Sequence, residues 1–536
     1  MEKFSRRQKI LLAIIAFAFF FSSSLLSFAN LIRPAGISPH FDWPDETMNA
    51  FFAKRFAEFG SLRAPLFFGS ELVRPRSFNV QNGALVPGGF LGLPLLYGAV
   101  IKFFGVNASL FATPFLAALA LLAFGGLVRR LLGARIALLA VLLAAAHPAV
   151  WYYSSYSYLP NVPYIAFLLF SAYLAVAGFS SAQKKKKLFL IAAAGALLGI
   201  ALAIRTNEIL WIAAALILAL AFTDVWRQAR PVALFLTAAV IFFAPIFWYQ
   251  WQTFGSALTT GYSRFTETGV AAPTEFAAAA ASPLKIAFSA LLLPYGFHPR
   301  VIWYNFWRSW LALAPWASVP FFLAAAAWFL RKKKQPAERA FSAVITVATV
   351  WLLAAYGSWM LADPLMLKLN TIGLSHVRYW LPFVFFDAVI LAWALARLKE
   401  RGRVWHLATG IFLAAYLAFS AWLVFWKAPE SLLYVAERVR LYNVAAKTIV
   451  EKTEPNAVII TDRTDKEIFP DRAVVAGLQL GDLSTVCSIS GPVYVYTVMT
   501  DLEDNVADTS WVVLPRAGYA LWLVADSTDR CTADTD

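Results

Sequence analysis

Hydrophobic residues occur along this chain in long runs rather than in the alternating patterns of a soluble protein. Many runs approach 20 residues, the length an α-helix needs to cross a hydrocarbon core about 30 Å thick. We expect about eleven spanning helices, three of which (136–150, 188–204 and 209–223) are short. The predicted spans are residues 10–31, 106–128, 136–150, 160–180, 188–204, 209–223, 231–250, 310–330, 339–362, 379–397 and 405–426.

Two further apolar stretches, 88–105 and 283–298, contain proline or glycine and adjoin polar loops. We expect them to be interfacial or re-entrant helices on the outer face, where surrounding protein or water satisfies an irregular backbone. The first run has a basic start, like a signal peptide. Its length and the absence of a small-residue cleavage site favour an uncleaved first span.

Basic residues predict the orientation of the spans. They gather at residues 3–9, 129–135, 184–187, 227–230, 331–334 and 399–403. If all of these are cytoplasmic, an even number of spans joins each neighbouring pair. The N-terminus is then inside, the C-terminal tail is outside, and residues 32–88 and 251–309 form two long outer loops.

Composition supports the membrane interpretation. Of the 536 residues, 60% are apolar and 14% are charged, against about 45–50% and about 25% in soluble domains. This composition argues against a soluble globular enzyme, and it excludes a disordered chain, a collagen and a disulfide-rich scaffold. The net charge of +15 does not require nucleic acid, because membrane proteins collect Lys and Arg on cytoplasmic loops.

The tail from Lys427 onward differs from the rest. It holds ten Lys or Arg and 17 Asp or Glu, a net charge of −7, so the preceding residues carry +22. We expect a helix at Glu430–Val450 and strands at 457–461 and 493–498. The predicted fold is an all-α polytopic membrane bundle (residues 1–426) with a small extracytoplasmic α/β domain (residues 427–536). Cys487 and Cys531 can pair there, because the compartment is oxidising.

An acidic segment follows the first span. Asp42, Asp45 and Glu46 lie where that helix meets the outer surface. A partly desolvated carboxylate there gains basicity and can take a proton from an acceptor hydroxyl. The alternative is structural, since acids after Pro44 favour the first turn of a helix.

Several stretches together carry a family resemblance. In chain order they are Asp45-Glu46, Gly88-Gly-Phe-Leu-Gly-Leu-Pro94 with Phe104-Gly105, His147-Pro148 with Ser157-Tyr-Leu-Pro-Asn161, Gly199-Ile-Ala-Leu-Ala-Ile-Arg205, Phe254-Gly-Ser-Ala-Leu-Thr-Thr-Gly-Tyr262, and His376-Val-Arg-Tyr-Trp-Leu-Pro382. They resemble the polytopic GT-C glycosyltransferases, which include protein mannosyltransferases, aminoarabinose transferases and rhizobial lipopolysaccharide glycosyltransferases. The chain has Pro-Gly-Gly where many members have His-Pro-Pro, and Asn161 where many have an acid. These departures leave the acceptor and a divalent-cation requirement open.

The resemblance implies transfer of a sugar from a polyprenyl-phosphate carrier to a lipid, glycan or protein acceptor on the outer face, with inversion. The phosphate leaving group needs cations rather than a general acid. By position in the motif, Asp45 is the expected base, Glu46 orients the acceptor or supports the helix, and Asp42 is the fallback base.

The same resemblance gives candidates for binding the carrier phosphate. They are Arg205, Arg378, His376, Tyr379, Arg300 and His298. Structural alternatives exist for each region: Arg205 can pair with Glu208, Arg378 can snorkel to lipid headgroups, and the loop carrying His298 and Arg300 can be an aromatic interfacial anchor. Asp387 lies within a predicted span and receives no role. The five histidines show no metal-ligand spacing, and no cofactor is assigned.

Two other classes of function remain open. A transporter or flippase for lipid-linked sugars predicts internal repeats and midplane polar groups, whereas the acids here gather at one surface. An assembly protein would tolerate loss of Asp45. The basic clusters suit a bacterial inner (plasma) membrane as well as an endoplasmic reticulum, and the resemblance of the motifs to bacterial members favours the bacterial membrane.

Overall fold

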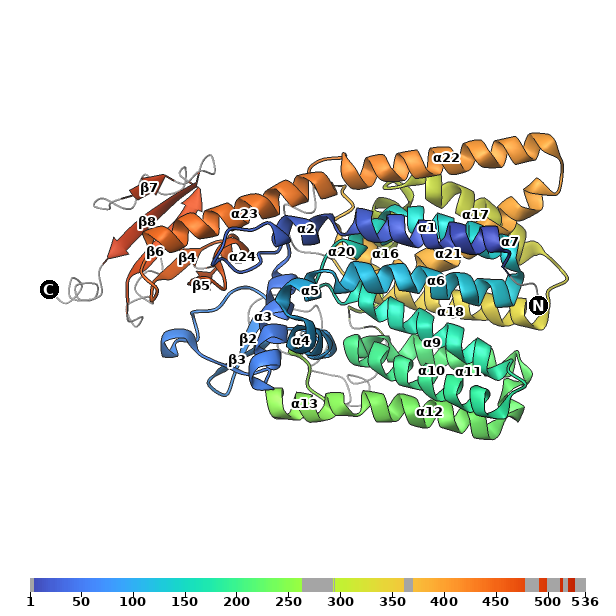
Figure 1. Cartoon of the computed structure of the whole chain (residues 1–536), viewed down its shortest axis with the longest axis horizontal. Coiled ribbons are helices and arrows are strands. Elements are labelled where there is room, and N and C mark those ends of the chain that lie inside the picture. Colours follow the sequence, from blue (N-terminus) through green and yellow to red (C-terminus); the bar gives the residue numbers. More distant parts are fainter. Residues whose placement is uncertain are drawn as a thin grey trace. The chain divides into compact units, whose positions relative to one another are not determined.

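The computed structural model describes residues 4–262, 293, 295–360, 370–477, 491–498, 511–513 and 519–525, with side chains for all but 497–498, 511–513 and 519–525. The predicted Cys487–Cys531 pair and most of the stretch 283–298 lie outside these residues. Contacts divide the chain into two compact units (Figure 1). Unit 1 comprises Met1–Ser24, Thr113–Ile246 and Thr266–Tyr434, and unit 2 comprises Leu25–Ala112, Phe247–Phe265 and Val435–Asp536.

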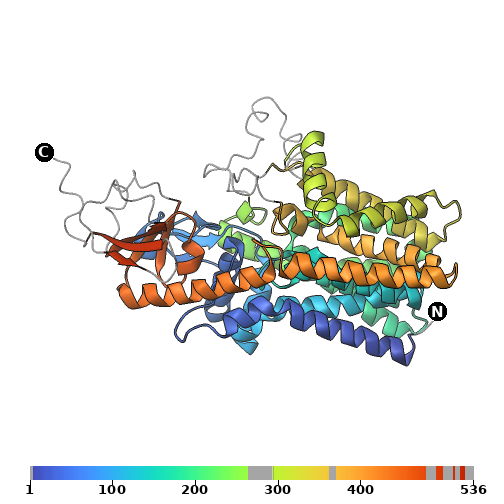
Figure 2. The same ribbon diagram turned by 90° about the horizontal axis from the view of Figure 1, so that it is seen from above.

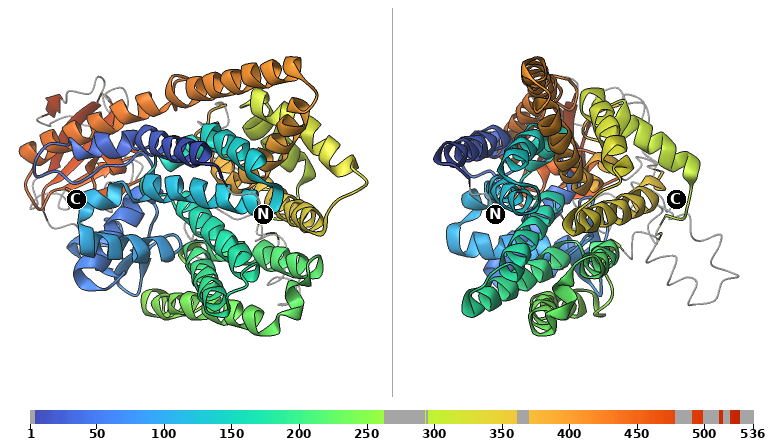
Figure 3. Two further views of the ribbon diagram at one scale, coloured as in Figure 1. Left: turned by 45° about the vertical axis from the view of Figure 1, so that its right-hand side comes forward. Right: turned by 90° about the vertical axis from the view of Figure 1, so that its right-hand side faces the viewer.

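Unit 1 is a bundle of apolar helices. Figure 3 (right) shows many of them nearly end-on. Its principal helices are α1 (Arg6–Ser23), α6 (Ala112–Leu132), α7 (Ala134–Ala146), α8 (Pro148–Ser154), α9 (Asn161–Phe179), α10 (Lys184–Ile204), η2 (Thr206–Glu208), α11 (Ile209–Ala221), η3 (Asp224–Arg227), α12 (Ala229–Phe243), α16 (Pro299–Phe306), η5 (Trp307–Leu311), α17 (Pro315–Leu330), α18 (Pro336–Gly357), α20 (Ser375–Tyr379), α21 (Leu381–Lys399) and α22 (Arg403–Phe425). α21 is the most enclosed of the long helices and packs against α7, α17 and α22.

The described residues contain seven helices long and apolar enough to cross a membrane, or up to ten if each bent pair is one span. The bent pairs are Arg6–Ser23 with Leu25–Leu31, Ala134–Ala146 with Pro148–Ser154, and Pro299–Leu311 with Pro315–Leu330. The chain is thus a multi-pass membrane protein, and the predicted count of eleven is not confirmed. The region predicted as the span 209–223 is a short apolar helix.

Proline explains two breaks that the predicted spans 136–150 and 310–330 did not anticipate. Pro148 and Pro315 each occupy the first turn of the second helix in a bent pair. Proline has no backbone N–H and clashes with the preceding turn, so it starts a helix more readily than it continues one. The axes therefore turn by 60° and 112° at these points.

Close packing of α10 on α12 depends on two glycines. A Cβ on Gly195 would lie 2.2 Å from the carbonyl oxygen of Phe235, and one on Gly199 would lie 2.4 Å from that of Ala239. Glycines four residues apart form one face, which lets two helix backbones approach. This contact positions the end of α10, where Arg205 follows.

Unit 2 contains the first long outer loop. Its elements outside the tail are α2 (Leu25–Leu31), α3 (Pro44–Phe59), β1 (Ala64–Pro65), η1 (Phe67–Gly69), β2 (Phe78–Gln81), β3 (Ala84–Pro87), α4 (Gly92–Phe104), α5 (Val106–Leu110) and α13 (Pro245–Phe254). The strands form an antiparallel sheet of order β1-β3-β2, with Val80 opposite Leu85. Asn82 and Gly83 both have positive φ and form the tight turn between β2 and β3, as two-residue hairpins favour.

The tail contributes a mixed sheet and helices to unit 2. Its elements are α23 (Leu432–Lys452), β4 (Val458–Thr461), α24 (Asp465–Ile468), β5 (Ala473–Ala476), β6 (Val493–Val498), β7 (Trp511–Val513) and β8 (Tyr519–Ala525). The order is β5-β4-β6-β8-β7, with β4 parallel to β5 and β6. Figure 2 shows α23 running alongside this sheet.

The outer loop and the tail share one hydrophobic core. Val73 of the loop is buried with Val458, Ile460 and Val495 of the tail strands. The compact unit therefore includes residues 25–112 together with the tail, whereas the sequence placed a domain boundary near residue 427. A separate α/β domain is not confirmed.

Candidate active site

The predicted acidic segment forms the start of α3 in unit 2. Pro44 is the first helical residue, and Asp45 and Glu46 lie in the first turn. Carboxylates there interact favourably with the helix dipole. The location of Asp45 and Glu46 therefore fits the structural alternative, in which acids after Pro44 stabilise the first turn of a helix. Their exposure differs: Glu46 is 2% exposed, whereas Asp45 is only half-buried. Of these two acids, Asp45 is the more accessible to a substrate.

Asp42 is held by side chains of the tail. Its carboxylate accepts hydrogen bonds from Arg438 at 2.7 Å and from Lys466 and Tyr442 at 3.4 Å each. Burial alone would raise the pKa of Asp42, but Lys466 and Arg438 outweigh it and hold that pKa below its ordinary value. A less basic carboxylate with occupied oxygens is a poor proton acceptor. These contacts argue against Asp42 as the fallback base.

Asp45 has a neighbour that the sequence did not suggest. Ser77 Oγ donates a hydrogen bond to Asp45 Oδ1 at 2.9 Å. Ser77 has φ of +66°, a backbone region that residues with a Cβ adopt infrequently. Ser77 immediately precedes β2, so its hydrogen bond links Asp45 to the small sheet.

In unit 1, Arg205 and Glu208 form a buried ion pair at 2.8 Å. Tyr356 joins the pair: its hydroxyl accepts from Arg205 Nη2 at 2.7 Å and donates to Glu208 Oε1 at 2.7 Å. Trp211 Nε1 donates to the other carboxylate oxygen at 2.5 Å. Arg205 therefore pairs with Glu208, as the structural alternative predicted.

Arg205 and Arg378 both lie against the ring of Tyr379. Their guanidinium carbons are 5.2 and 5.1 Å from its centroid. Tyr356 stacks on the same ring, with centroids 4.7 Å apart and planes 12° apart. Two cations around one aromatic ring provide planar hydrogen-bond donors of the kind that bind phosphate. The structure therefore brings three predicted residues together: Arg205, Arg378 and Tyr379.

Arg378 is enclosed rather than extended toward a lipid surface. It is 6% exposed, and its carbonyl accepts a hydrogen bond from Asn161 at 3.1 Å. Tyr153 donates to the carbonyls of Ile372 and Leu374, which lead into the helix that carries Arg378. These contacts disfavour the snorkelling interpretation. They also give Asn161 a structural contact at the position where an acid was expected.

His376 is a neutral hydrogen-bonding residue beside this cluster. Its Nε2 lies 3.1 Å from the carbonyl of Trp359, and burial lowers its pKa to about 4. His298 and Arg300, by contrast, are exposed on and beside α16. Within the described residues, no hydrogen bond or ion pair links these two to the arginine cluster.

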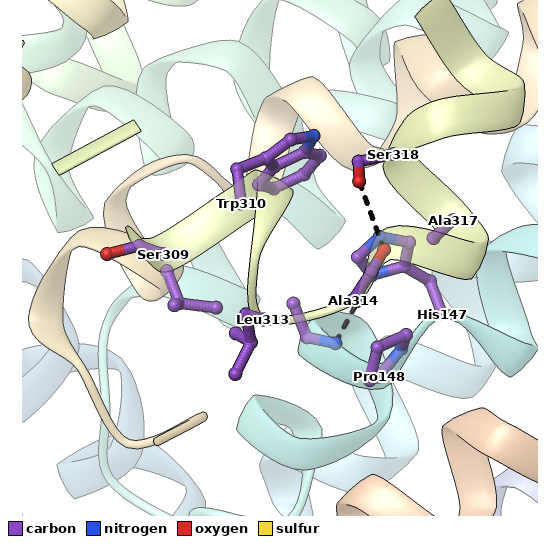
Figure 4. A pocket seen from close by; sticks show the side chains of 10 residues that line it. His147, Pro148, Ser309, Trp310, Leu313, Ala314, Ala317 and Ser318 are labelled. Atoms are coloured by element: carbon purple, nitrogen blue, oxygen red, sulfur yellow. Dashed lines mark hydrogen bonds between the residues drawn. The ribbon is translucent and has the colours of Figure 1, made fainter. Parts of the chain in front are cut away.

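A pocket in unit 1 adjoins the helix that carries His376 and Arg378, because Val377 is one of its lining residues (Figure 4). His147, Trp310, Ala314 and Ser318 are among its lining residues. His147 Nδ1 accepts from the N–H of Ala149, and its ring stacks on Trp310 at 5.5 Å. None of the predicted acids or arginines lines this pocket, so we assign it no substrate.

Sequence reasoning missed Ser77, Tyr356 and Trp359. Ser77 is one serine in a polar loop, and Tyr356 lies inside the predicted span 339–362, so neither has a distinguishing local pattern. In the described part of the chain, no cluster of three His, Cys, Asp or Glu residues is arranged to hold a metal ion.

A model of the dolichyl-phosphate-mannose-protein mannosyltransferase family matches residues 91–249. No curated protein sequence matches the chain.

Solved structures share the fold. The structure is similar to that of ArnT from Cupriavidus metallidurans bound to undecaprenyl phosphate, with a TM-score of 0.60, 12% identity, and coverage of 96% of this chain and 98% of that one. It is also similar to the oligosaccharyltransferase AglB from Archaeoglobus fulgidus, in complex with an inhibitory peptide and a dolichol-phosphate. That match has a TM-score of 0.52, 12% identity, and coverage of 92% and 70% of the two chains. The family match over residues 91–249 and the shared fold agree with the resemblance drawn from the sequence.

Proposed function

We propose that this chain, which resembles the GT-C glycosyltransferases in family match and in fold, transfers a sugar from a polyprenyl-phosphate carrier to an acceptor hydroxyl. The acceptor is a lipid, a glycan or a protein on the extracytoplasmic face. The protein lies in the inner (plasma) membrane, with its N-terminus cytoplasmic and its tail outside. The observation that carries the proposal is the arrangement of Arg205 and Arg378 around Tyr379.

The reaction needs a base for the acceptor. Asp45 takes the proton of the acceptor hydroxyl, and the resulting oxygen attacks the anomeric carbon from the face opposite the phosphate. The bond between the anomeric carbon and the phosphate oxygen breaks, and the configuration at that carbon inverts. Glu46 is nearly fully buried, and its role is to support the start of α3.

The reaction also needs cations for the leaving group. Polyprenyl phosphate departs with its electron pair, and charge-assisted hydrogen bonds stabilise that anion. Arg378 is the main candidate, and Arg205 contributes while tied to Glu208. Tyr379 orients both guanidinium groups. The acid and the arginines belong to different units, and each role rests on the geometry within its own unit.

A donor panel tests the proposal. Purified protein in proteoliposomes would receive radiolabelled polyprenyl-phosphate sugars of different kinds, with membrane lipids and envelope glycans as acceptors. We expect transfer from one donor, with an anomeric configuration in the product opposite to that of the donor. Movement of intact labelled lipid between leaflets, with no transfer from any donor, would contradict the proposal and support a flippase. Product of retained configuration would contradict the one-step attack.

A further inference from the structure

A one-turn helix of the tail contacts the chain on both sides of Asp45. α24 (Asp465–Ile468) presents two adjacent residues of opposite charge. Asp465 binds the loop before β2, and Lys466 binds the segment before α3. All of these residues belong to unit 2.

The first contact reaches Asp45 through Arg76 and Ser77. Asp465, which is 1% exposed, accepts from the Arg76 backbone N–H at 2.9 Å and from Arg76 Nε at 2.7 Å. Because Arg76 is held at both backbone and side chain, the next residue has a fixed position. That residue is Ser77, whose hydroxyl donates to Asp45.

The second contact fixes the backbone that precedes α3. Lys466 Nζ donates to the carbonyl oxygen of Asp42 at 2.6 Å and to its carboxylate at 3.4 Å. Beside it, His40 Nδ1 lies 3.0 Å from the Lys466 carbonyl and His40 Nε2 lies 3.0 Å from Asp471. The chain is therefore tied to the tail within three residues of Asp45.

We infer that α24 positions Asp45, through Asp465, Arg76 and Ser77 on one side and through Lys466 and Asp42 on the other. Asp465, Lys466 and Ser77 are positioning residues, because they act on the acceptor through Asp45. This inference rests on the proposed function for the role of Asp45. The tail then contributes to catalysis by holding Asp45 in place.

Ser77→Gly tests the hydroxyl separately from the backbone. Glycine adopts a φ of +66° without strain, so the variant loses the donor to Asp45 while the loop keeps its conformation. We expect kcat for sugar transfer to fall about 10- to 100-fold, with KM for the lipid donor and the unfolding temperature unchanged. The matched control is Asn82→Gly, which makes the same kind of change at φ of +48° in the exposed β2–β3 turn. Wild-type kcat in Ser77→Gly would overturn the inference and leave the proposed function intact.

Amide hydrogen exchange gives a test that does not depend on activity. In Asp465→Asn we expect faster exchange of the Glu46 and Thr47 amides, which donate to the Trp43 carbonyl in the first turn of α3. Unchanged exchange there would overturn the inference. If the wild-type protein transfers no sugar, the proposed function fails, and this exchange measurement still decides whether α24 holds the start of α3.

Discussion

Arg438 Nη2 donates a hydrogen bond to Asp42 Oδ2 at 2.7 Å, although 396 residues separate the two along the chain. The contact joins α23 of the tail to the segment that precedes α3. Asp42 therefore serves as an anchor for the outer loop. Asp45 is half-buried and therefore more accessible than Asp42, which is 7% exposed, so Asp45 is left as the acid with a chemical role.

Removing Arg438 should destabilise unit 2. Arg438→Ala leaves a largely buried Asp42 carboxylate with less compensation, and breaking such a pair costs about 3–5 kcal/mol. We expect a clear fall in the unfolding temperature of the detergent-purified protein. The control is Arg440→Ala on the same helix, whose partner Glu437 is exposed and whose loss should leave that temperature unchanged. Equal stability of both variants would show that Asp42 is not an anchor.

Stability should decrease in acid. Arg438 and Lys466 hold the pKa of Asp42 below its ordinary value of 3.8 despite burial, and His40 and Ser38 likewise lower that of Asp471. A lowered folded-state pKa adds stability above the ordinary pKa, and this stability is lost as pH falls through the folded-state value. Unfolding temperatures measured from pH 6 to pH 3 should therefore fall steeply below about pH 4. Asp42→Asn should flatten this acid dependence, and a slope equal to that of the wild type would refute its ion-pair origin.

Widening the α10–α12 contact should displace Arg205. In Gly199→Ala the new Cβ would meet the Ala239 carbonyl oxygen at 2.4 Å, so one helix must move. Overpacking of this kind costs about 1–3 kcal/mol, and we expect weaker donor binding as well. Gly410→Ala in α22 is the control, because nothing lies within 4 Å of its added Cβ. A Gly199→Ala variant as stable and active as Gly410→Ala would contradict the packing argument.

Arg378 should contribute to donor binding as well as to the departure of the phosphate. Loss of a hydrogen bond to a charged group costs about 1.5–3 kcal/mol, so Arg378→Ala should raise KM for the lipid donor about 10- to 100-fold. Arg378→Lys should recover only part of this, because an ammonium cannot donate two parallel hydrogen bonds or stack on Tyr379 as guanidinium does. Steady-state kinetics with each variant measure the effect. Full recovery by lysine would mean that charge alone matters at this position.

Much of the helical architecture could be predicted because apolar runs report directly on membrane helices. α9, α10, α21 and α22 lie close to their predicted ranges. The breaks at Pro148 and Pro315 were missed because both prolines lie within continuous apolar runs. The hydrophobicity of a run is a sum over many residues. A helix break, by contrast, depends on one proline, which lacks a backbone N–H at its own position.

Tertiary contacts could not be predicted from local pattern. The loop carrying Asp42 and the tail carrying Arg438 look like separate polar segments in sequence, but they share a core around Val73. Motif resemblance did select Arg205, Arg378 and Tyr379, which the fold brings together. It gave no signal for Ser77, because a single serine acquires significance only from its neighbour in space.

The kcat of Asp45→Asn tests the account most directly. Asparagine keeps the shape of the side chain and its hydrogen bond with Ser77 but cannot take a proton at neutral pH. Glu58→Gln is the matched control, since Glu58 is a solvent-exposed acid near the end of the same helix. In proteoliposomes with the active donor, we predict a kcat about 10²- to 10⁴-fold below wild type for Asp45→Asn, with KM for the donor and the unfolding temperature unchanged. Wild-type kcat in a folded Asp45→Asn protein would contradict the assignment of Asp45 as the base.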